Sequence, residues 1–486
     1  MSNLLRRPIA ACSLLATLAL AGCSGPSARL AGGSQEAERE VGEKLAKYVE
    51  RTIGVADDRT LATYVREVGD RLAGQAQRSE VEYRFQVVDM VAPNAFALPG
   101  GHVYVSRGLL ALMNSEDELA GVVGHEIAHV EARHAVKRSQ ARLAMAPLQI
   151  AAGVTGVLAS LISSDLGTSI AAAGDFFLAP YSREQEREAD RIGQDLAAKA
   201  GWRPEGLTTL LETLDREEER EGERPRGASF LATHPSTPDR VAASAQHAAR
   251  LVPAPGEPIA GDQPAFLAKL DGMLLGENPR NGVFVGSRFL HPVAGLRMAF
   301  PDKWLTGRVS GAVGAASPGR LDVMLLRPAG ADDEPLAVAR AQEKRSGVRL
   351  LEHAQALQIN GLPAVQSEVQ VRGKKDTYWL LLTWVKLGRV VYLVTGVSPR
   401  SRAEFFGPIM KRSIETFGAL SEAERAEVTA VVLRSVQAQA GETLQALQVR
   451  AASPWDADMI AIANGVPKDV RFRGGELVKV AARERF

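Results

Sequence analysis

Cysteine is almost absent from this sequence: of 486 residues only Cys12 and Cys23 are cysteines, and both lie near the start. The remainder of the chain therefore has no disulfide framework, no cysteine-ligated zinc site and no cysteine nucleophile. An excess of one charge sign is also missing, because 58 Lys and Arg residues balance 57 Asp and Glu residues. Without a basic excess, we expect no nucleic-acid partner. The hydrophobic fraction of 45% is typical of a globular protein, and the length indicates about three domains.

The first residues predict a secretory signal peptide. Arg6 and Arg7 precede an apolar run from Pro8 to Ala21, which is too short to span a bilayer, and small residues close it. The sequence from Leu20 to Cys23, LAGC, resembles the lipobox of bacterial lipoproteins.

The lipobox resemblance implies a signal peptide over 1–22, lipid attached to Cys23, and a lipidated linker over 23–33. Ser24, rather than an aspartate, implies sorting to the outer membrane. We therefore expect a periplasmic protein that is anchored to the outer membrane by the lipid on Cys23. The alternatives are an uncleaved anchor and a soluble secreted protein.

The stretch from Val122 to His134, VVGHEIAHVEARH, lies on a predicted helix. Ser115 stands three residues before Glu118, which is the pattern of a reciprocal capping box at a helix start. Five apolar residues then recur at helical spacing, as in a helix that packs on a core. They are Leu119, Val122, Val123, Ile127 and Val130.

His125 and His129 are four residues apart, so on this helix their side chains share one face and can bind one metal ion. Glu126 is rotated by about 100° from His125, so it is not a ligand in line with the histidines. It can instead reach a water molecule bound to the ion. This is the H-E-x-x-H arrangement of two zinc ligands and a general base. The alternative is a chance spacing of two histidines on a solvated helix face.

A second, strongly charged helix is predicted between Pro180 and Trp202. Glu186 and Asp190 are four residues apart on one of its faces. A glutamate from a second helix completes a zinc site with two histidines, and an aspartate one turn on can accept a hydrogen bond from a ligand histidine. Taken alone, the stretch is typical of a solvated helix with ion pairs along its surface.

Four motifs together resemble the HtpX/BepA-type zinc metallopeptidases, a family that includes the CAAX prenyl endopeptidases. In chain order they are Asn94–Leu110, His125–His129, Ser182–Asp190 and Thr233–Arg240. The resemblance implies a zinc metallopeptidase domain over 34–250 and one zinc ion per chain.

The same resemblance implies roles for single residues. Glu186 is the implied third zinc ligand, and Asp190 is its implied companion. His234 is implied to face the zinc, where it either stabilises the oxyanion or caps the metal in the idle enzyme. Arg240 is implied to support catalysis. Two further histidines match no family ligand, and we interpret them as surface or packing residues: His102 and His134.

A hairpin is predicted beside the zinc site, because Pro99-Gly100-Gly101 forms a turn before the alternating, β-prone residues HVYVS. An exposed edge strand there can pair with an extended substrate backbone, which suits a protease that acts on unfolded segments. The alternative is an ordinary hairpin within the sheet. The residues assigned to the substrate-binding edge strand are Asn94, Ala95, Phe96, His102 and Val103.

A charge-free segment from Ala144 to Ser164 has the length of a membrane span. A single crossing would put Glu186 on the opposite side of the membrane from His125, so the site could not form. The 36 residues from Ala144 to Ala179 are too few for two spans of about 20 residues each. We therefore expect one or two apolar helices that cover the cleft or rest on the membrane surface.

The second half predicts two further units after a Pro- and Gly-rich linker over 251–281. Residues 282–420 alternate like strands and resemble the PsbP/Mog-like α/β sandwich, with a closing helix broken or kinked at Gly407-Pro408. This unit has no catalytic constellation, so we expect binding or scaffolding. Residues 421–486 resemble the LysM module, a βααβ unit that binds N-acetylglucosamine chains, which implies peptidoglycan as a partner. The alternative is a helical cap with a terminal hairpin.

We therefore expect an α+β protein: a mainly helical zincin-type protease domain with a small β-sheet, then the α/β sandwich and the βααβ module. By resemblance, it degrades misfolded or misassembled outer-membrane and periplasmic proteins and meets the outer-membrane assembly machinery. One alternative is a zinc-locked, chaperone-like assembly factor or cell-wall-binding protein with little proteolysis. A cell-wall hydrolase is a third alternative.

Overall fold

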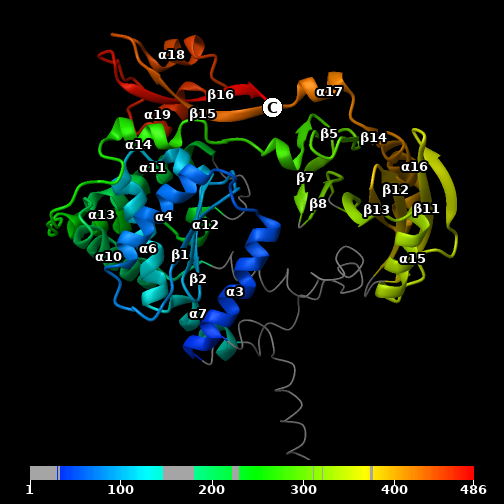
Figure 1. Cartoon of the computed structure of the whole chain (residues 1–486), viewed down its shortest axis with the longest axis horizontal. Coiled ribbons are helices and arrows are strands. Elements are labelled where there is room, and N and C mark those ends of the chain that lie inside the picture. Colours follow the sequence, from blue (N-terminus) through cyan, green and yellow to red (C-terminus); the bar gives the residue numbers. More distant parts are fainter. Residues whose placement is uncertain are drawn as a thin grey trace, which may run out of the picture.

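The computed structural model describes residues 30, 33–145, 180–221, 229–309, 311–319, 321–372 and 376–486. The predicted signal peptide, Cys23 and all but the first two residues of the apolar stretch 144–164 lie outside these residues. Within them, helices and strands form a helix-rich N-terminal part, a β-rich middle part and a C-terminal part (Figure 1). None of the described helices has the length and apolar character needed to cross a membrane.

The helix-rich part surrounds a small sheet. Its strands are β1 (Arg84–Val88), β2 (Ala95–Leu98) and β3 (His102–Ser106). Its helices are α3 (Gln35–Thr52), α4 (Arg59–Ala73), α5 (Arg107–Leu112), α6 (Glu116–Glu131), α7 (His134–Met145), α10 (Arg183–Lys199), α11 (Glu205–Glu221), α12 (Phe230–Thr233), α13 (Pro238–Ala248) and α14 (Gln263–Leu270). Side chains of α4 and α6 form the core on one face of the sheet, and side chains of α3 and α7 form the core on the other face.

Strand β3 is the centre of this sheet, because β1 pairs with it in parallel and β2 pairs with it antiparallel. Both edges of β3 are occupied, so His102 and Val103 cannot pair with a substrate backbone. Their assignment to a substrate-binding edge strand is wrong; the edge strands are β1 and β2, of which β2 begins at the assigned residue Ala95. The local sequence pattern predicts the β2–β3 hairpin but does not reveal that β1 returns to pair with its far side.

Helix α6 starts where the sequence predicts it. The Ser115 side chain accepts a hydrogen bond from the backbone N–H of Glu118 at 3.3 Å, as an N-cap does. The reciprocal half of the predicted capping box is wrong, because Glu118 Oε2 instead accepts from the backbone N–H of Asn114 at 2.6 Å. Of the 16 residues of α6, 14 are buried, so this helix runs through the core rather than over its surface.

Two glycines allow α6 and α10 to cross at close range. A Cβ atom on Gly193 would lie 2.6 Å from the backbone nitrogen of His125, and a Cβ atom on Gly124 would lie 2.8 Å from the carbonyl oxygen of Gly193. Both distances are shorter than packed atoms allow. The crossing places the face of α10 that carries Glu186 and Asp190 against the face of α6 that carries the histidines.

The middle part contains two antiparallel sheets, ordered β10-β11-β12-β13-β9-β8-β7 and β14-β6-β5-β4. The strands are β4 (Val283–Val285), β5 (Arg288–His291), β6 (Leu296–Ala299), β7 (Leu305–Val309), β8 (Ala312–Ala316), β9 (Val323–Ala331), β10 (Gln355–Ile359), β11 (Leu362–Arg372), β12 (Thr377–Leu387), β13 (Val390–Pro399) and β14 (Gly418–Ala419). The helices are η2 (Pro279–Asn281), α15 (Pro335–Ser346), η3 (Arg400–Arg402) and α16 (Ala403–Ile414). Helix α16 is continuous through Pro408, so it is not broken there.

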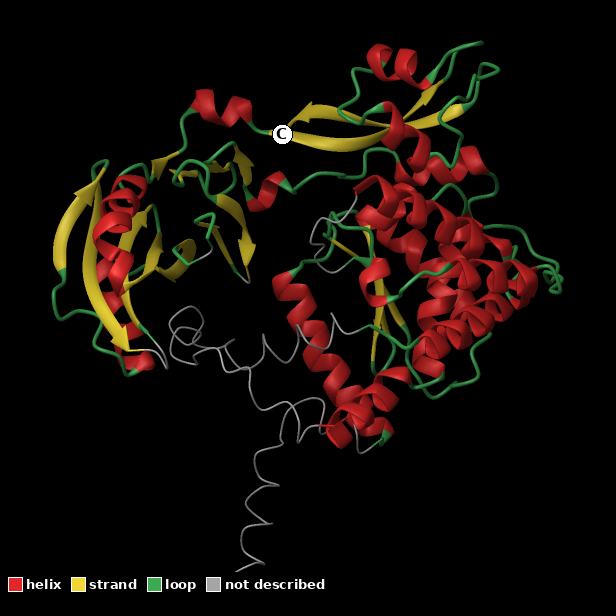
Figure 2. Ribbon diagram, turned by 180° about the vertical axis from the view of Figure 1, so that it is seen from behind, coloured by secondary structure: helices red, strands yellow, loops and turns green. Residues whose placement is uncertain are grey.

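The C-terminal part follows α17 (Glu422–Glu427) and has the predicted βααβ order. Its elements are β15 (Thr429–Gln437), α18 (Leu444–Arg450), α19 (Ala457–Ala463) and β16 (Leu477–Arg485). Residues 251–281 are not a free linker: Phe266 and Leu270 of α14 are buried in the N-terminal core, and Leu274 pairs with Val432 of β15. The paired strands β15 and β16 therefore lie against the helix-rich part (Figure 2).

Candidate functional site

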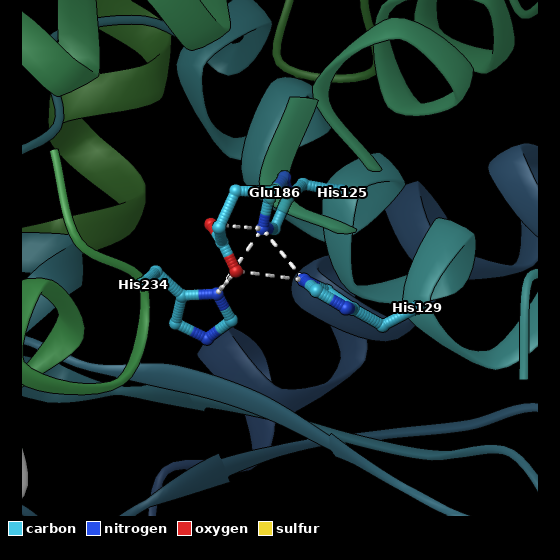
Figure 3. A group of neighbouring side chains, drawn as sticks. All are labelled: His125, His129, Glu186 and His234. Atoms are coloured by element: carbon cyan, nitrogen blue, oxygen red, sulfur yellow. Dashed lines mark hydrogen bonds and ion pairs between the residues drawn. The ribbon is translucent and has the colours of Figure 1, made fainter. Parts of the chain in front are cut away.

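Four side chains that the sequence predicts at the site meet inside the helix-rich part (Figure 3). His125 and His129 come from α6, Glu186 comes from α10, and His234 directly follows α12. The Nε2 atoms of His125 and His129 lie 3.0 Å apart. Nδ1 of His234 lies 3.0 Å from Oε1 of Glu186 and 3.2 Å from Nε2 of His125. All four side chains are buried.

These residues fit a zinc ion. One ligand atom from each of the four lies within 4.8 Å of the others, and ring nitrogens with a carboxylate oxygen are a donor set that zinc takes in tetrahedral sites. Burial and the neighbouring His125 and His234 lower the pKa of His129 well below its ordinary value. The ring of His129 is therefore neutral, and one of its nitrogens has a lone pair to offer a cation.

Glu126 lies beside this cluster and has a different environment. Its carboxyl group is fully buried, and no described side chain forms a hydrogen bond with either oxygen; the backbone of Ala97 is the polar group that acts on it. Nε2 of His234 lies 3.6 Å from Glu126 Oε1. Burial, with a contribution from the Glu186 carboxylate, raises the pKa of Glu126 well above its usual range. A buried carboxyl group without a side-chain partner is suited to take up and release a proton.

Asp190 and Arg240 form a layer behind the ligands. Arg240 donates from Nε and Nη2 to the two oxygens of Asp190 at 2.7 and 2.8 Å, and its Nη1 lies 2.7 Å from Oε2 of Glu186. Oδ1 of Asp190 lies 2.9 Å from Nδ1 of His125. Burial alone would raise the pKa of Asp190, but Arg240 and His125 outweigh it and hold this pKa below its usual range. The sequence resemblance implies that Arg240 supports catalysis, and these contacts are those of a residue that positions its neighbours.

Two aromatic rings that the sequence did not single out stack on histidines of the site. The ring of Tyr181 stacks on His129 at a centroid distance of 4.0 Å, and the ring of Phe230 stacks on His234 at 4.5 Å. Burial raises the pKa of Tyr181 to about 12, so its hydroxyl stays protonated. Tyr181 directly precedes the Ser182–Asp190 motif, which is the signal that could have identified it.

His134 lies in the interior, so the surface half of its predicted interpretation is wrong, and it also contacts a candidate ligand. Its side chain is fully buried, and its Nδ1 lies 2.8 Å from Nδ1 of His129. Its Nε2 lies 3.2 Å from Oε2 of Glu188 on α10. His102 is buried on β3, as a packing residue is.

Strand β2 runs beside the reacting groups. The backbone of Ala97 interacts with the Glu126 carboxyl group, and the backbone of Ala95 interacts with the His234 ring. Among the described strands β2 pairs only with β3, so its other edge is unpaired.

A cavity of about 660 Å³ lies elsewhere, between the end of α3 and the middle part, and none of the four candidate ligands lines it. Donor geometry, rather than cavity size, therefore locates the site.

Comparison with known proteins agrees with this geometry. Residues 60–248 match the model of peptidase family M48. The chain is similar to the mitochondrial metalloendopeptidase OMA1 of Schizosaccharomyces pombe, with 34% identity over 208 residues that cover 43% of this chain and 58% of that protein. It is also similar to the beta-barrel assembly-enhancing protease of Escherichia coli K12, with 28% identity over 220 residues that cover 44% and 45% of the two chains.

The chain thus spans about half the length of the curated relatives it matches. Among solved structures, the cyanobacterial PsbP of Synechocystis sp. PCC 6803 aligns with 30% of this chain and 98% of its own at 14% identity. The TM-score of that alignment is 0.24, which does not establish a shared fold.

Proposed function

Residues 60–248 belong to peptidase family M48, and on that premise we propose that the chain is a zinc-dependent endopeptidase. The observation that carries the proposal is the buried Glu126 carboxyl group, which no described side chain hydrogen-bonds, beside a complete set of zinc donors. The proposed zinc ligands are His125, His129 and Glu186, with one ion per chain.

Each residue of the site has a task in peptide hydrolysis. A bound zinc ion supplies Lewis acidity and lowers the pKa of a water molecule toward 7. Glu126 accepts the proton of the attacking water and then passes it to the leaving amine. The unpaired edge of β2 aligns the substrate as an added strand, because backbone hydrogen bonds hold an extended segment whatever its side chains are. Asp190 and Arg240 keep His125 and Glu186 in place.

The substrates we propose are unfolded or misassembled proteins of the bacterial envelope. The support is the likeness to a beta-barrel assembly-enhancing protease, together with an edge strand that reads backbone rather than side chains. We further propose a periplasmic location with a lipid anchor on Cys23, contact with the outer-membrane assembly machinery, and peptidoglycan contact through residues 421–486. The support for these three proposals is the sequence resemblance alone.

A second candidate, a zinc-locked protein with little proteolysis, is favoured by the position of His234. Nδ1 of His234 lies 3.0 Å from Oε1 of Glu186, which is close enough for both atoms to bind one ion. His234 therefore completes a four-residue donor set. A tetrahedral site filled by four side chains has no position for a catalytic water. We therefore propose that His234 restrains the resting enzyme and leaves the site when a substrate enters.

The full-length protein allows a direct test of the enzymatic proposal. The zinc content per chain is measured together with cleavage of casein, before and after removal of the metal with a chelator and again after zinc is restored. We expect one zinc per chain and cleavage that disappears and returns with the metal. A chain that binds zinc but cleaves casein and an unfolded outer-membrane protein only when His234 is replaced by alanine would support the zinc-locked alternative. No cleavage in either form, with zinc bound, would contradict the peptidase.

A further inference from the structure

The ligand His129 has a buried hydrogen-bonding neighbour to which the proposed mechanism gives no task. Nδ1 of His134 lies 2.8 Å from Nδ1 of His129, and Nε2 of His134 lies 3.2 Å from Oε2 of Glu188. The three groups form a continuous chain from the site to the surface, because His134 is fully buried while the Glu188 side chain is 38% exposed. Lys137 lies 3.9 Å from the same Glu188 oxygen.

The Glu188 carboxylate fixes the direction of both hydrogen bonds that link Glu188, His134 and His129. An ionised Glu188 only accepts, so Nε2 of His134 carries the hydrogen and Nδ1 of His134 is left as an acceptor. That acceptor faces Nδ1 of His129, which must then carry a hydrogen and donate it. In a neutral ring the remaining nitrogen has the free lone pair, and in His129 this is the Nε2 atom that faces His125 and Glu186.

We propose that His134 and Glu188 are a positioning pair for the zinc ligand His129, which together select the tautomer and rotamer that present Nε2 to the metal. The inference rests on the proposed zinc site but not on proteolysis. The other ligand histidine has a carboxylate beside its outer nitrogen without an intermediary, because Oδ1 of Asp190 lies 2.9 Å from Nδ1 of His125. Both histidines of α6 are therefore backed by carboxylates of α10 (Glu188 and Asp190), one through His134 and one directly.

Packing alone does not account for this arrangement. The Tyr181 ring stacks on His129 with an interplanar angle of 25°, which restrains the tilt of the imidazole. A stacked ring can still flip by 180° about its Cβ–Cγ bond, and this flip would replace Nε2 at the metal by a carbon atom. A hydrogen bond to Nδ1 distinguishes the two orientations, and His134 provides it.

The test measures zinc affinity of the full chain by competition with a chromophoric chelator, a readout that does not need proteolysis. His134→Phe keeps an aromatic ring of similar size but has no acceptor, so we expect zinc to bind roughly 10- to 100-fold more weakly, as with other lost partners of metal-binding histidines. His134→Asn restores an acceptor oxygen near the position of Nδ1 and should recover most of the loss. The visible absorption of the cobalt-substituted protein should change in His134→Phe and return toward wild type in His134→Asn.

The matched control is His247→Phe. Nε2 of His247 lies 2.8 Å from Oδ1 of Asp195, so it also ties a helix to α10 through a carboxylate, but it touches no ligand. We expect wild-type zinc affinity in this variant. Equal losses in His247→Phe and His134→Phe, or wild-type affinity and an unchanged cobalt spectrum in a folded His134→Phe, would overturn the proposal.

Glu188→Leu provides a second route if His134→Phe does not fold, since Glu188 lies at the solvent edge. Weaker zinc binding in this variant supports the pair, and unchanged binding contradicts it. A wild-type protein that binds zinc but cleaves nothing would contradict the proposed peptidase and leave these binding results intact.

Discussion

Glu126 and Arg240 are both buried beside the proposed zinc ligands, yet their surroundings are opposite. The guanidinium of Arg240 contacts the carboxylates of Asp190 and Glu186. Neither carboxyl oxygen of Glu126 has a hydrogen-bonded side-chain partner among the described residues. A side chain with its donors engaged holds its neighbours in place, whereas a carboxyl group without side-chain partners is free to exchange protons with a substrate or water. Arg240 therefore serves to position its neighbours, and Glu126 serves the chemistry.

Replacing Arg240 tests the positioning role. Arg240→Met leaves the buried Asp190 and Glu186 carboxylates without their cation, and breaking a buried ion pair in this way costs about 3–5 kcal/mol of stability. We expect a large fall in the thermal unfolding temperature, which differential scanning calorimetry measures. Arg389→Met is the control, because its pair with Asp332 is solvent-exposed, and it should not change that temperature measurably. Similar behaviour of the two variants would contradict the role of Arg240.

His234→Ala distinguishes restraint from catalysis by the sign of its effect. If His234 occupies the fourth position at the zinc, its removal opens that position to water, and basal cleavage of casein or of the chain itself should rise. Zinc should remain bound through the other three ligands, which a metal analysis checks. A fall in the cleavage rate of about 10²–10³-fold would instead assign His234 to the oxyanion, and an unchanged rate would assign it neither role.

The proposed ligands could be predicted from the sequence, while His134 could not, and helix geometry explains the difference. The four-residue spacing of His125 and His129 fixes their common face on any regular helix. His134 follows His129 by five residues, which on the same helix would place it about 140° away. Helix α6 ends at Glu131, however, and Arg133 adopts a positive φ of 54°, so the chain turns and returns His134 to the site.

At the scale of secondary-structure elements, the crossing of α6 and α10 decides whether the site exists. The two helices are more than fifty residues apart in sequence, and nothing in either pattern predicts their distance. The structure sets this distance at Gly124 and Gly193, where each glycine faces the backbone of the other helix. Because neither position has a side chain, the helices approach closely enough to bring Oε1 of Glu186 to 3.5 Å from Nε2 of His129.

Gly193→Ala should therefore damage the site even though alanine favours a helix. The added Cβ would lie 2.6 Å from the backbone nitrogen of His125, so the helices must separate, and we expect a loss of roughly 1–3 kcal/mol of stability. Zinc affinity should fall as well, because Glu186 moves away from the histidines. Gly307→Ala, where no atom lies within 4 Å of the new Cβ, is the control for both measurements. Unchanged zinc affinity in Gly193→Ala would show that the crossing does not set the ligand distance.

At the scale of the whole molecule, the C-terminal part is attached to the helix-rich part by a buried lysine. Lys479 of β16 donates to the carbonyl oxygens of Ala111, at 2.9 Å, and of Met113, at the end of α5. Glu118, in the first turn of α6, is the charged group that acts on it most strongly. The βααβ order of this part could be predicted from its resemblance to a known module, whereas its docking site could not, because it depends on a contact across more than 360 residues.

The buried lysine makes this attachment dependent on pH. Burial lowers the pKa of Lys479 to about 7, against 10.5 for an unburied lysine, so between these values unfolding takes up a proton. Stability then rises with pH across this window, by at most about 1.4 kcal/mol per pH unit. The unfolding temperature of wild type relative to Lys479→Met should increase from pH 7 to pH 9. Lys468→Met, at an exposed lysine of the same part, should show no such change. A pH-independent difference for Lys479→Met would contradict the buried titration.

Glu126→Gln tests the division between metal binding and proton transfer most directly, because glutamine preserves the size of the side chain and removes its basicity. In the full-length protein, zinc content and casein cleavage are measured together for wild type and variant. We predict one zinc per chain in both, and cleavage that falls at least about 10²-fold in the variant, as expected for a lost general base. Loss of zinc from Glu126→Gln, or cleavage at the wild-type rate with zinc still bound, would contradict the assignment of Glu126.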